Sequence, residues 1–449
     1  MKTNVLLIVI DSLRSDKCFG PEKTSFTPNL DKLITHGLCF PNTISSAPAS
    51  IPAVSSILSG LYPFRSLKID GERFSLKNNI ATIPSILKNS GYYTTAKIPK
   101  ILKLMDLEKI FHKIDYYDDQ STLYDGIGDE IISKLNSLKN AQPWMLYLHL
   151  NDIHGQSIFH KDFVHSEFNN KKLGENQYER MLSLVDIWLG KIIEKIDIQN
   201  TLIILTADHG SDVASFDDSL EEFSRKTREI LKEKKNLMIT SGQKITSKLP
   251  SSFRPLRKSL SKIYRKQRDK NFTKKSVPII EYIESQTFEP YHKRLLLNIF
   301  SGSNMPYDEK FKVPLIISSP NIKKSIMHKS QIRTIDILPT IMGILNHDPI
   351  PNIHGENLIS ITNGKTIPDI PAYIECHKNI VDYNSENNNE NIVGIRTPQF
   401  KYFRKTSSSN SCYLFNLEKD PFEMENICKK LPVVVDEMEK LIKKVKNSN

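Results

Sequence analysis

Three side chains with the chemistry of metal ligands follow two apolar runs of the sequence. Asp11 comes directly after residues 5–10, and Asp208 and His209 come shortly after residues 201–206. Both runs are rich in β-branched residues, which is typical of strands buried on both faces of a parallel sheet. Open α/β sheets place their ligands at the carboxyl ends of such strands. We therefore expect the three side chains to converge; the alternative is that they only cap turns.

The types of these side chains favour a single divalent ion. Two carboxylates, one imidazole and the hydroxyl of Ser50 make a mixed oxygen and nitrogen set that suits one cation with an open position. Calcium prefers oxygen ligands throughout, so His209 favours manganese or zinc over calcium. The sequence predicts one divalent ion (Ca, Mn or Zn) held by Asp11, Asp208 and His209.

Ser50 is the candidate nucleophile. Pro48 and Pro52 flank it in a stiff approach, and Pro52 suits the first turn of a helix that Gly60 would end. At the N-terminus of that helix, free backbone N–H groups and the positive end of the dipole favour an anion. This position suits a hydroxyl that attacks a sulfate or phosphate ester. The simpler alternative is a serine that caps a buried helix.

The stretch around Ser50 resembles the signature of the sulfatases. Residues 50–60 read S-x-P-x-x-x-x-x-L-S-G, and the family signature is C/S-x-P-S-R-x-x-x-L-T-G, with Ser50 at the nucleophile position. The phrase N-V-L-L-I-V-I-D-S-L-R-S-D is similar to the opening of sulfatases, where the residue matching Asp11 binds the metal. With the D-H-G at residues 208–210, the pattern also resembles phosphonate and phosphodiester hydrolases of the alkaline phosphatase superfamily. The resemblance covers roughly residues 1–210 and 305–430.

Three positions depart from the family pattern. Ala53 and Val54 stand where the signature has Ser and Arg, and Ser12 stands where many sulfatases have a second metal-binding Asp. In sulfatases the Cys or Ser at the nucleophile position becomes formylglycine, and the Arg supports that chemistry. Whether Ser50 is modified to formylglycine therefore stays open.

The resemblance also implies a proton donor for the leaving oxygen. His154 follows the apolar run 144–150, like the family histidine that faces the leaving group, whereas His149 lies within the run and is interpreted as a packed histidine. A catalytic lysine is implied after the G-Y-Y-T at residues 91–94. Lys97 and Lys100 are both candidates, and a solvated lysine is an equal alternative for each.

The alternation of strands and helices predicts an α/β fold. The first two-thirds of the chain favour a doubly wound, mostly parallel central sheet, and the last part favours a small antiparallel α+β subdomain. We expect an alkaline phosphatase/sulfatase-like catalytic domain over residues 1–350, interrupted by a basic, partly helical insertion at about 212–300. Residues 351–449 are expected to form the C-terminal sheet and helix.

The positive charge of the chain is concentrated in one segment. The formal net charge is +11, and residues 221–275, here called the basic arm, hold 18 Lys and Arg against 5 Asp and Glu. A solvated basic face would explain the arm. The alternative is a polyanionic partner, such as an acidic glycan, a lipid surface or a nucleic acid.

Cysteine usage and hydropathy favour a cytoplasmic protein. The five cysteines (Cys18, Cys39, Cys376, Cys412 and Cys428) are odd in number and lack C-x-x-C spacing. This pattern argues against a disulfide framework or a zinc ribbon and favours a reducing compartment. The apolar run at residues 5–10 is too short for a signal peptide, and no run is long enough to predict a membrane span.

Together these features predict a metal-dependent, sulfatase-like hydrolase, a sulfuric ester hydrolase acting on a small-molecule or glycan ester. One alternative is a phosphodiester or phosphonate monoester hydrolase, or a phosphoryl-headgroup transferase, that uses unmodified Ser50. A second alternative is a non-catalytic relative that binds an anionic glycan.

Overall fold

The fold is taken from a computed structural model of the chain. The structure describes residues 2–21, 23–70, 73–139, 141, 143–154, 170–212, 276–300, 305–320, 322, 325–363, 365, 367–377, 391–406 and 411–448, with Leu220, Phe223 and Thr227.

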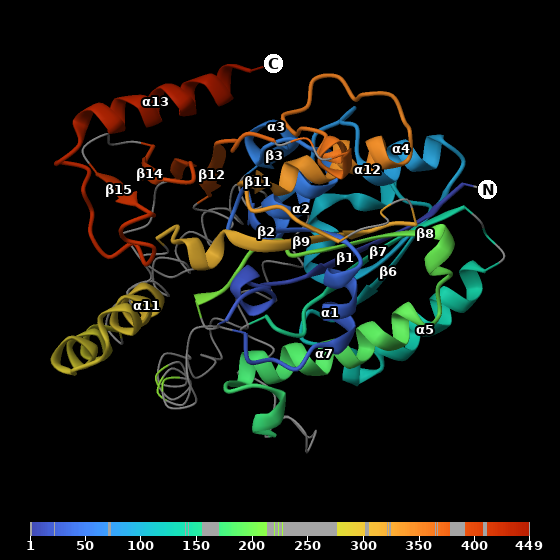
Figure 1. Ribbon diagram of the computed structural model, residues 1–449, viewed down its shortest axis with the longest axis horizontal. Coiled ribbons are helices and arrows are strands. Elements are labelled where there is room, and N and C mark those ends of the chain that lie inside the picture. The colour runs from blue at the N-terminus through green and yellow to red at the C-terminus, as the bar shows by residue number, and fades with distance from the viewer. Residues whose placement is uncertain are drawn as a thin grey trace, which may run out of the picture.

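A nine-stranded sheet lies at the centre of the protein (Figure 1). The strand order is β10-β2-β9-β8-β1-β7-β5-β6, and β11 pairs with β2 outside this path. All pairings are parallel except the two that β9 makes, with β2 and β8. The predicted mostly parallel, doubly wound sheet is therefore confirmed. The strands are β1 (Asn4–Ile10), β2 (Leu38–Ile44), β5 (Tyr93–Pro99), β6 (Lys113–Tyr117), β7 (Trp144–Leu150), β8 (Thr201–Thr206), β9 (Lys312–Ser318), β10 (Ile326–Met327) and β11 (Ile332–Arg333).

Helices cover both faces of this sheet, because alternate side chains of a strand point to opposite faces. Leu6 and Ile8 of β1 pack in one apolar cluster with α1 (Pro28–Thr35), α5 (Ile127–Leu138) and α7 (Gln177–Ile193). Figure 1 shows these three helices together on one side of the sheet. Val5 and Leu7 pack in the other cluster, with α2 (Ser50–Ser59), α4 (Ile83–Asn89) and α12 (Ile337–Ile344).

A second, four-stranded sheet forms the C-terminal part of the chain. Its strands pair antiparallel throughout, and residues of α13 (Pro432–Asn447) pack into its apolar cluster. This confirms the predicted C-terminal antiparallel sheet with a helix. The strands are β12 (Ala372–Cys376), β13 (Ile392–Arg396), β14 (Phe400–Lys405) and β15 (Cys412–Asn416).

The C-terminal sheet also touches the segment that leads to α2. The backbone N–H of Glu375 in β12 donates to the carbonyl oxygen of Ser46 at 2.9 Å. After α2 the chain continues through α3 (Pro63–Ser66) into a hairpin of β3 (Leu67–Asp70) and β4 (Arg73–Leu76). Residues far apart in the sequence therefore meet beside the N-terminus of α2.

A disulfide joins Cys412 and Cys428, a pair that the cysteine pattern did not predict. Cys412 begins β15 and Cys428 follows 16 residues later, with their Cα atoms 6.3 Å apart. The spacing of these two cysteines matches no sequence motif. They meet only because the loop after β15 folds back. Cys18, Cys39 and Cys376 are buried free thiols. The cellular location of the protein stays a prediction.

Part of the predicted insertion at 212–300 is described and helical. Residues 276–285 and α11 (Pro290–Phe300) form helices, whereas the basic arm lies outside the described residues apart from Phe223 and Thr227. The domain boundaries stay predictions. Among the helices that the structure describes, none combines the length and apolar character needed to cross a membrane.

Candidate active site

Asp11, Asp208 and His209 come together beyond the carboxyl ends of β1 and β8. These strands pair in parallel, with Val9 opposite Thr206, so the residues that follow them emerge at the same edge. The His209 Nε2 atom lies 3.7 Å from Asp11 Oδ1 and 3.7 Å from Asp208 Oδ2. All three residues are buried, and one ligand atom from each lies within 4.8 Å of the others.

One oxygen of Asp208 indicates that a cation belongs at this edge. Asp208 Oδ1 accepts hydrogen bonds from the backbone N–H of His209 at 2.7 Å and of Ser12 at 3.3 Å. Asp208 Oδ2 is buried and has no hydrogen-bond partner within the part of the chain that the structure describes. A buried carboxylate oxygen without a partner is costly. A divalent ion beside Asp208 Oδ2 would remove that cost, so the residues fit a metal.

The His209 ring is oriented to offer Nε2 to such an ion. Its Nδ1 lies 2.9 Å from the carbonyl oxygen of Gly210. A carbonyl can only accept, so the proton sits on Nδ1 and the Nε2 lone pair faces the carboxylates. Burial lowers the pKa of His209, but the charges of Asp208 and Asp11 outweigh it and raise this pKa above its ordinary value.

The turn after His209 needs a glycine. The backbone N–H of Gly210 donates to the carbonyl oxygen of Lys310 at 2.9 Å, in the short helix η10 (Asp308–Lys310). A Cβ at Gly210 would lie 2.1 Å from the carbonyl oxygen of Glu309. The Lys310 ammonium lies 3.1 Å from Asp212 Oδ2, and its charge opposes protonation of His209. Lys310 could not be predicted as a neighbour of this pair from sequence, because about a hundred residues separate it from Asp208 and His209.

His149 of β7 lies between the two carboxylates. It is fully buried, as a packed histidine would be, but its Nε2 lies 3.5 Å from Asp11 Oδ2 and 3.7 Å from Asp208 Oδ2. Its Nδ1 lies 2.8 Å from the hydroxyl oxygen of Tyr147. Burial raises the pKa of Asp11, but His154, His149 and His209 together lower it well below its ordinary range. His149 thus stabilises the carboxylate form of Asp11.

We expect His149→Ala to lower metal affinity by about 10- to 100-fold, because partners that orient metal ligands contribute that much. Tyr147→Phe removes only the hydroxyl beside His149 Nδ1 and should cause a smaller loss in the same direction. Calorimetric titration of each metal-free variant with manganese measures the two affinities. Unchanged affinity in a folded His149→Ala protein would leave His149 with a packing role alone.

Ser50 is the first residue of α2, and its side chain points to the same carboxylate. Its Oγ donates to Asp11 Oδ2 at 3.1 Å, and the residue is half-buried. Gly60 ends the helix with φ of +66°, as predicted. Val54 is fully buried in the apolar cluster on that face of the sheet, where the signature would place an arginine. The structure therefore brings Ser50 to the candidate metal ligands without a cation at position 54.

The candidate proton donors lie in different surroundings. His154 follows β7 on the next turn, and its charge is the largest of the histidine effects that lower the pKa of Asp11. Lys97 in β5 is buried and forms an ion pair with Glu130 of α5. Lys100 is largely exposed, and its ammonium lies 3.5 Å from Asp118. The structure places His154 near Asp11 and pairs both lysines with other acids; their roles stay predictions.

Comparison with known proteins identifies the family. The family model described as "Sulfatase" matches residues 3–347. The chain belongs to the sulfatase family. A second model, described as "N-sulphoglucosamine sulphohydrolase, C-terminal", matches residues 299–448. This sulfatase is a sulfuric ester hydrolase of a metal-dependent family, as the motifs predicted.

Curated relatives and solved structures agree with this assignment. Arylsulfatase K of Gallus gallus is 22% identical over 478 residues, which cover 99% of this chain and 83% of the relative. Iduronate 2-sulfatase of Homo sapiens is 34% identical over 112 residues, 24% of this chain and 18% of the relative. A solved 2-O GAG sulfatase has a TM-score of 0.64 at 16% identity, covering 100% of this chain and 93% of its own. At this low identity, the similarity to the solved structure shows the fold alone.

In this sulfatase Ser12 supports both carboxylates. Its Oγ donates to Asp11 Oδ1 at 2.8 Å, and its backbone N–H donates to Asp208 Oδ1. Its φ is +67°, a left-handed conformation that costs a non-glycine residue energy. The hydroxyl of Tyr178 donates to the Ser12 carbonyl oxygen at 2.8 Å and helps to hold the turn. Ser12 therefore adds hydrogen bonds where a second Asp would add charge.

Proposed function

We propose that this sulfatase hydrolyses a sulfate ester of a sugar, with Ser50, or formylglycine formed from it, as the nucleophile. The observation that carries the proposal is the 3.1 Å contact between Ser50 Oγ and Asp11 Oδ2. It joins a half-buried hydroxyl at a helix N-terminus to a cluster of candidate metal ligands. An anionic ester fits there, because both the backbone N–H groups and a cation attract its oxygens.

Asp11, Asp208 and His209 would hold the metal, and a bound divalent ion supplies Lewis-acid stabilisation of charge on the sulfate oxygens. The Ser50 hydroxyl donates a hydrogen bond to Asp11 Oδ2, which leaves the lone pairs of Oγ free to face sulfur. In the reaction an Oγ–S bond would form as the bond from sulfur to the ester oxygen breaks, and the Ser50 hydroxyl proton would pass to solvent. His154 would protonate the departing oxygen. Water would then attack sulfur and break the S–Oγ bond, so that sulfate leaves and a proton from the water returns to Ser50 Oγ.

The state of Ser50 is part of this proposal. Val54 removes the arginine that supports formylglycine chemistry in the family, and its buried, apolar surroundings leave no room for a charged replacement. We therefore favour unmodified Ser50. Intact-mass measurement of the peptide that contains Ser50 tests this point, since formylglycine is lighter than serine by two hydrogen atoms.

A sugar sulfate is the substrate class that the relatives favour. One structural neighbour was solved in complex with its substrate D-glucosamine-2-N,6-O-disulfate, and another in complex with k-i-k-neocarrahexaose. These ligands belong to those proteins, and they support a sulfated glycan as the substrate here. His209 favours manganese or zinc over calcium as the ion.

Turnover of 4-nitrophenyl sulfate and of sulfated mono- and disaccharides, with each of manganese, zinc and calcium, tests the proposal. Sulfate release that depends on a divalent ion is the expected result. Turnover of 4-nitrophenyl phosphate without any turnover of sulfate esters would favour the phosphoester alternative.

The basic arm gives a prediction about partners. Its net positive charge should raise the local concentration of polyanions, an effect that salt screens over about 8 Å at physiological ionic strength. Deleting residues 221–275 should leave turnover of a small aryl sulfate nearly unchanged and weaken binding to a sulfated polysaccharide, most strongly at low salt. Equal losses on both substrates would instead mean that the arm shapes the active site.

A further inference from the structure

The short helix η10 (Asp308–Lys310) lies beside the turn that carries two of the candidate metal ligands. It precedes β9 by one residue, and β9 pairs antiparallel with β8. Helix η10 therefore lies at the edge where residues 208–212, here called the ligand turn, follow β8. The carbonyl oxygen of Lys310 accepts a hydrogen bond from the backbone N–H of Gly210 at 2.9 Å. Because Gly210 directly follows His209, this bond fixes the backbone of the ligand turn.

Two further contacts join the same region to the ligand turn. The carbonyl oxygen of Phe311, the residue after η10, accepts the backbone N–H of Ser45 at 2.8 Å, and the Ser45 hydroxyl donates to the carbonyl oxygen of Asp208. The Lys310 ammonium lies 3.1 Å from Asp212 Oδ2. The position of the ligand turn therefore depends on the position of η10.

The C-terminal sheet holds η10 through its first residue, Asp308. Arg396 of β13 donates from Nε to Asp308 Oδ1 at 3.1 Å and from its terminal nitrogen to Oδ2 at 2.7 Å. Lys401 of β14 donates from Nζ to Asp308 Oδ1 at 2.8 Å. The backbone N–H of Asp308 donates to Glu423 Oε2, from the segment after β15, at 2.6 Å. Three separate parts of the C-terminal region thus bind one residue of η10.

These contacts are charged and shielded from solvent. Lys401 is fully buried, and Arg396 is buried as well. Burial raises the pKa of Asp308, but Arg396 and Lys401 lower it well below its ordinary value, so the carboxylate is ionised. Hydrogen bonds between ionised groups are shorter and stronger than those between neutral groups. Removing one partner of such a buried pair leaves an uncompensated charge, which is costly.

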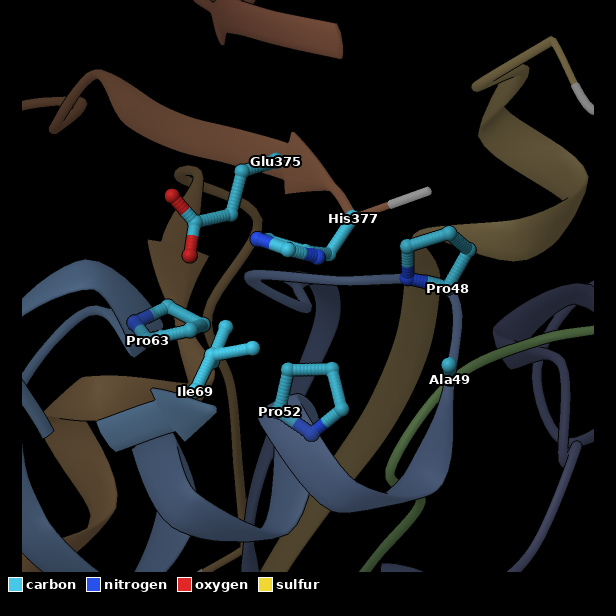
Figure 2. A pocket seen from close by; sticks show the side chains of 7 residues that line it. All are labelled: Pro48, Ala49, Pro52, Pro63, Ile69, Glu375 and His377. Carbon is cyan, nitrogen blue, oxygen red and sulfur yellow. The ribbon is translucent and has the colours of Figure 1, made fainter. Parts of the chain in front are cut away.

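The C-terminal sheet also adjoins the segment that carries Ser50. Figure 2 shows Glu375, in β12, and His377 on one side of a hollow and Pro52 on the other. The backbone of Glu375 is hydrogen-bonded to the same segment at Ser46. The C-terminal sheet therefore contacts both parts of the candidate site, the helix of the nucleophile and, through η10, the ligand turn.

We propose that Asp308 is a positioning residue for the metal site, through which the C-terminal sheet holds the ligand turn. Arg396 and Lys401 fix Asp308, Asp308 fixes η10, and η10 fixes the ligand turn in the geometry that binds the ion. This inference rests on the proposed function, because it takes Asp208 and His209 as ligands of the metal. It makes the C-terminal sheet part of the catalytic unit, although none of its residues is a candidate ligand.

Asp308→Asn tests the inference, because it keeps the shape of the side chain and removes its charge. Calorimetric titration of the metal-free protein with manganese should show affinity lowered about tenfold. This is the low end of the loss for partners that orient metal ligands, since Asp308 acts through the backbone. Hydrogen exchange of a peptide that contains Gly210, followed by mass spectrometry, should become at least about tenfold faster, because the bond to Lys310 opens more often.

Arg396→Lys is a milder variant of the same contact. It keeps a positive charge beside Asp308 and loses the paired donors of the guanidinium group. Manganese affinity should fall about threefold, in the same direction as in Asp308→Asn. This variant decides the question if Asp308→Asn does not fold.

Glu439→Gln is the matched control. Glu439 of α13 accepts hydrogen bonds from Arg404 of β14 at 3.2 Å and from the Tyr402 hydroxyl at 2.8 Å, so this ion pair joins two C-terminal elements and includes no residue of η10. The change should lower the melting temperature but leave manganese affinity and the exchange of the Gly210 peptide within about a factor of two.

Unchanged manganese affinity in folded Asp308→Asn and Arg396→Lys proteins would overturn the inference and leave Asp308 with a purely structural role. An equal loss of affinity in Glu439→Gln would overturn it as well, because any weakening of the C-terminal sheet would then have the same effect. The proposed function fails separately: it would be lost if the manganese-loaded wild type turned over no sulfate ester, even with the effect of Asp308 on metal affinity intact.

Discussion

Ser50→Ala is expected to lower kcat/KM for an aryl sulfate by at least about a thousandfold, the scale of loss seen when a nucleophile is removed. The expectation holds whether residue 50 acts as serine or as formylglycine, because alanine has no hydroxyl group and is not a precursor of formylglycine. Metal content should fall little, because Asp11, Asp208 and His209 keep their contacts with one another. Steady-state kinetics with parallel metal analysis separates loss of the nucleophile from loss of the ion.

Ser56→Ala provides the matched control in the same helix. The Ser56 hydroxyl is buried and has no hydrogen-bond partner among the described residues. The Ser56→Ala change should leave kcat/KM within about a factor of two of the wild-type value. It should not lower the free energy of unfolding, because it removes a buried hydroxyl that has no hydrogen-bond partner in the described structure. If Ser50→Ala kept more than about a tenth of the activity, Ser50 would be a helix-capping residue instead.

The convergence of the site was predictable because it depends on local pattern and sheet topology. The apolar runs at β1 and β8 are buried on both faces, which is why their sequences lack alternation. Once both runs are parallel neighbours, Asp11 and Asp208 must emerge at one edge. Ser50 followed from Pro52 and Gly60, which fix where α2 begins and ends.

Residues whose roles depend on distant pairings could not be predicted in the same way. His149 is a single polar residue inside an apolar strand, and a lone strand cannot show that two carboxylates from β1 and β8 face it. Cys412 and Cys428 meet only because the loop after β15 returns, and Glu375 reaches the Ser50 segment only because β12 pairs with Ser46. No spacing in the sequence encodes these contacts.

The second large effect is expected from Asp208→Ala. Asp208 Oδ2 is the buried oxygen without a hydrogen-bond partner in the described structure, and it lies 3.7 Å from the Nε2 atoms of both His149 and His209. Removing this ligand should weaken metal binding by more than about a hundredfold, beyond the loss for an orienting partner. Sulfatase activity should fall with it, while circular dichroism should show the fold retained.

The pH dependence of metal binding provides an independent test of the same site. The ion needs the neutral form of His209, and in the metal-free protein Asp208 and Asp11 raise the pKa of this imidazole. Protons therefore begin to compete with the metal at a higher pH than for an ordinary histidine, and affinity should fall as pH drops from about 8 to about 6. In the Asp208→Ala protein, the charge of Asp208 no longer raises the pKa of His209. Any metal affinity that remains should therefore begin to fall at a lower pH than in the wild type. Wild-type metal content in a well-folded Asp208→Ala protein, or affinity independent of pH in the wild type, would show that the ion is held elsewhere.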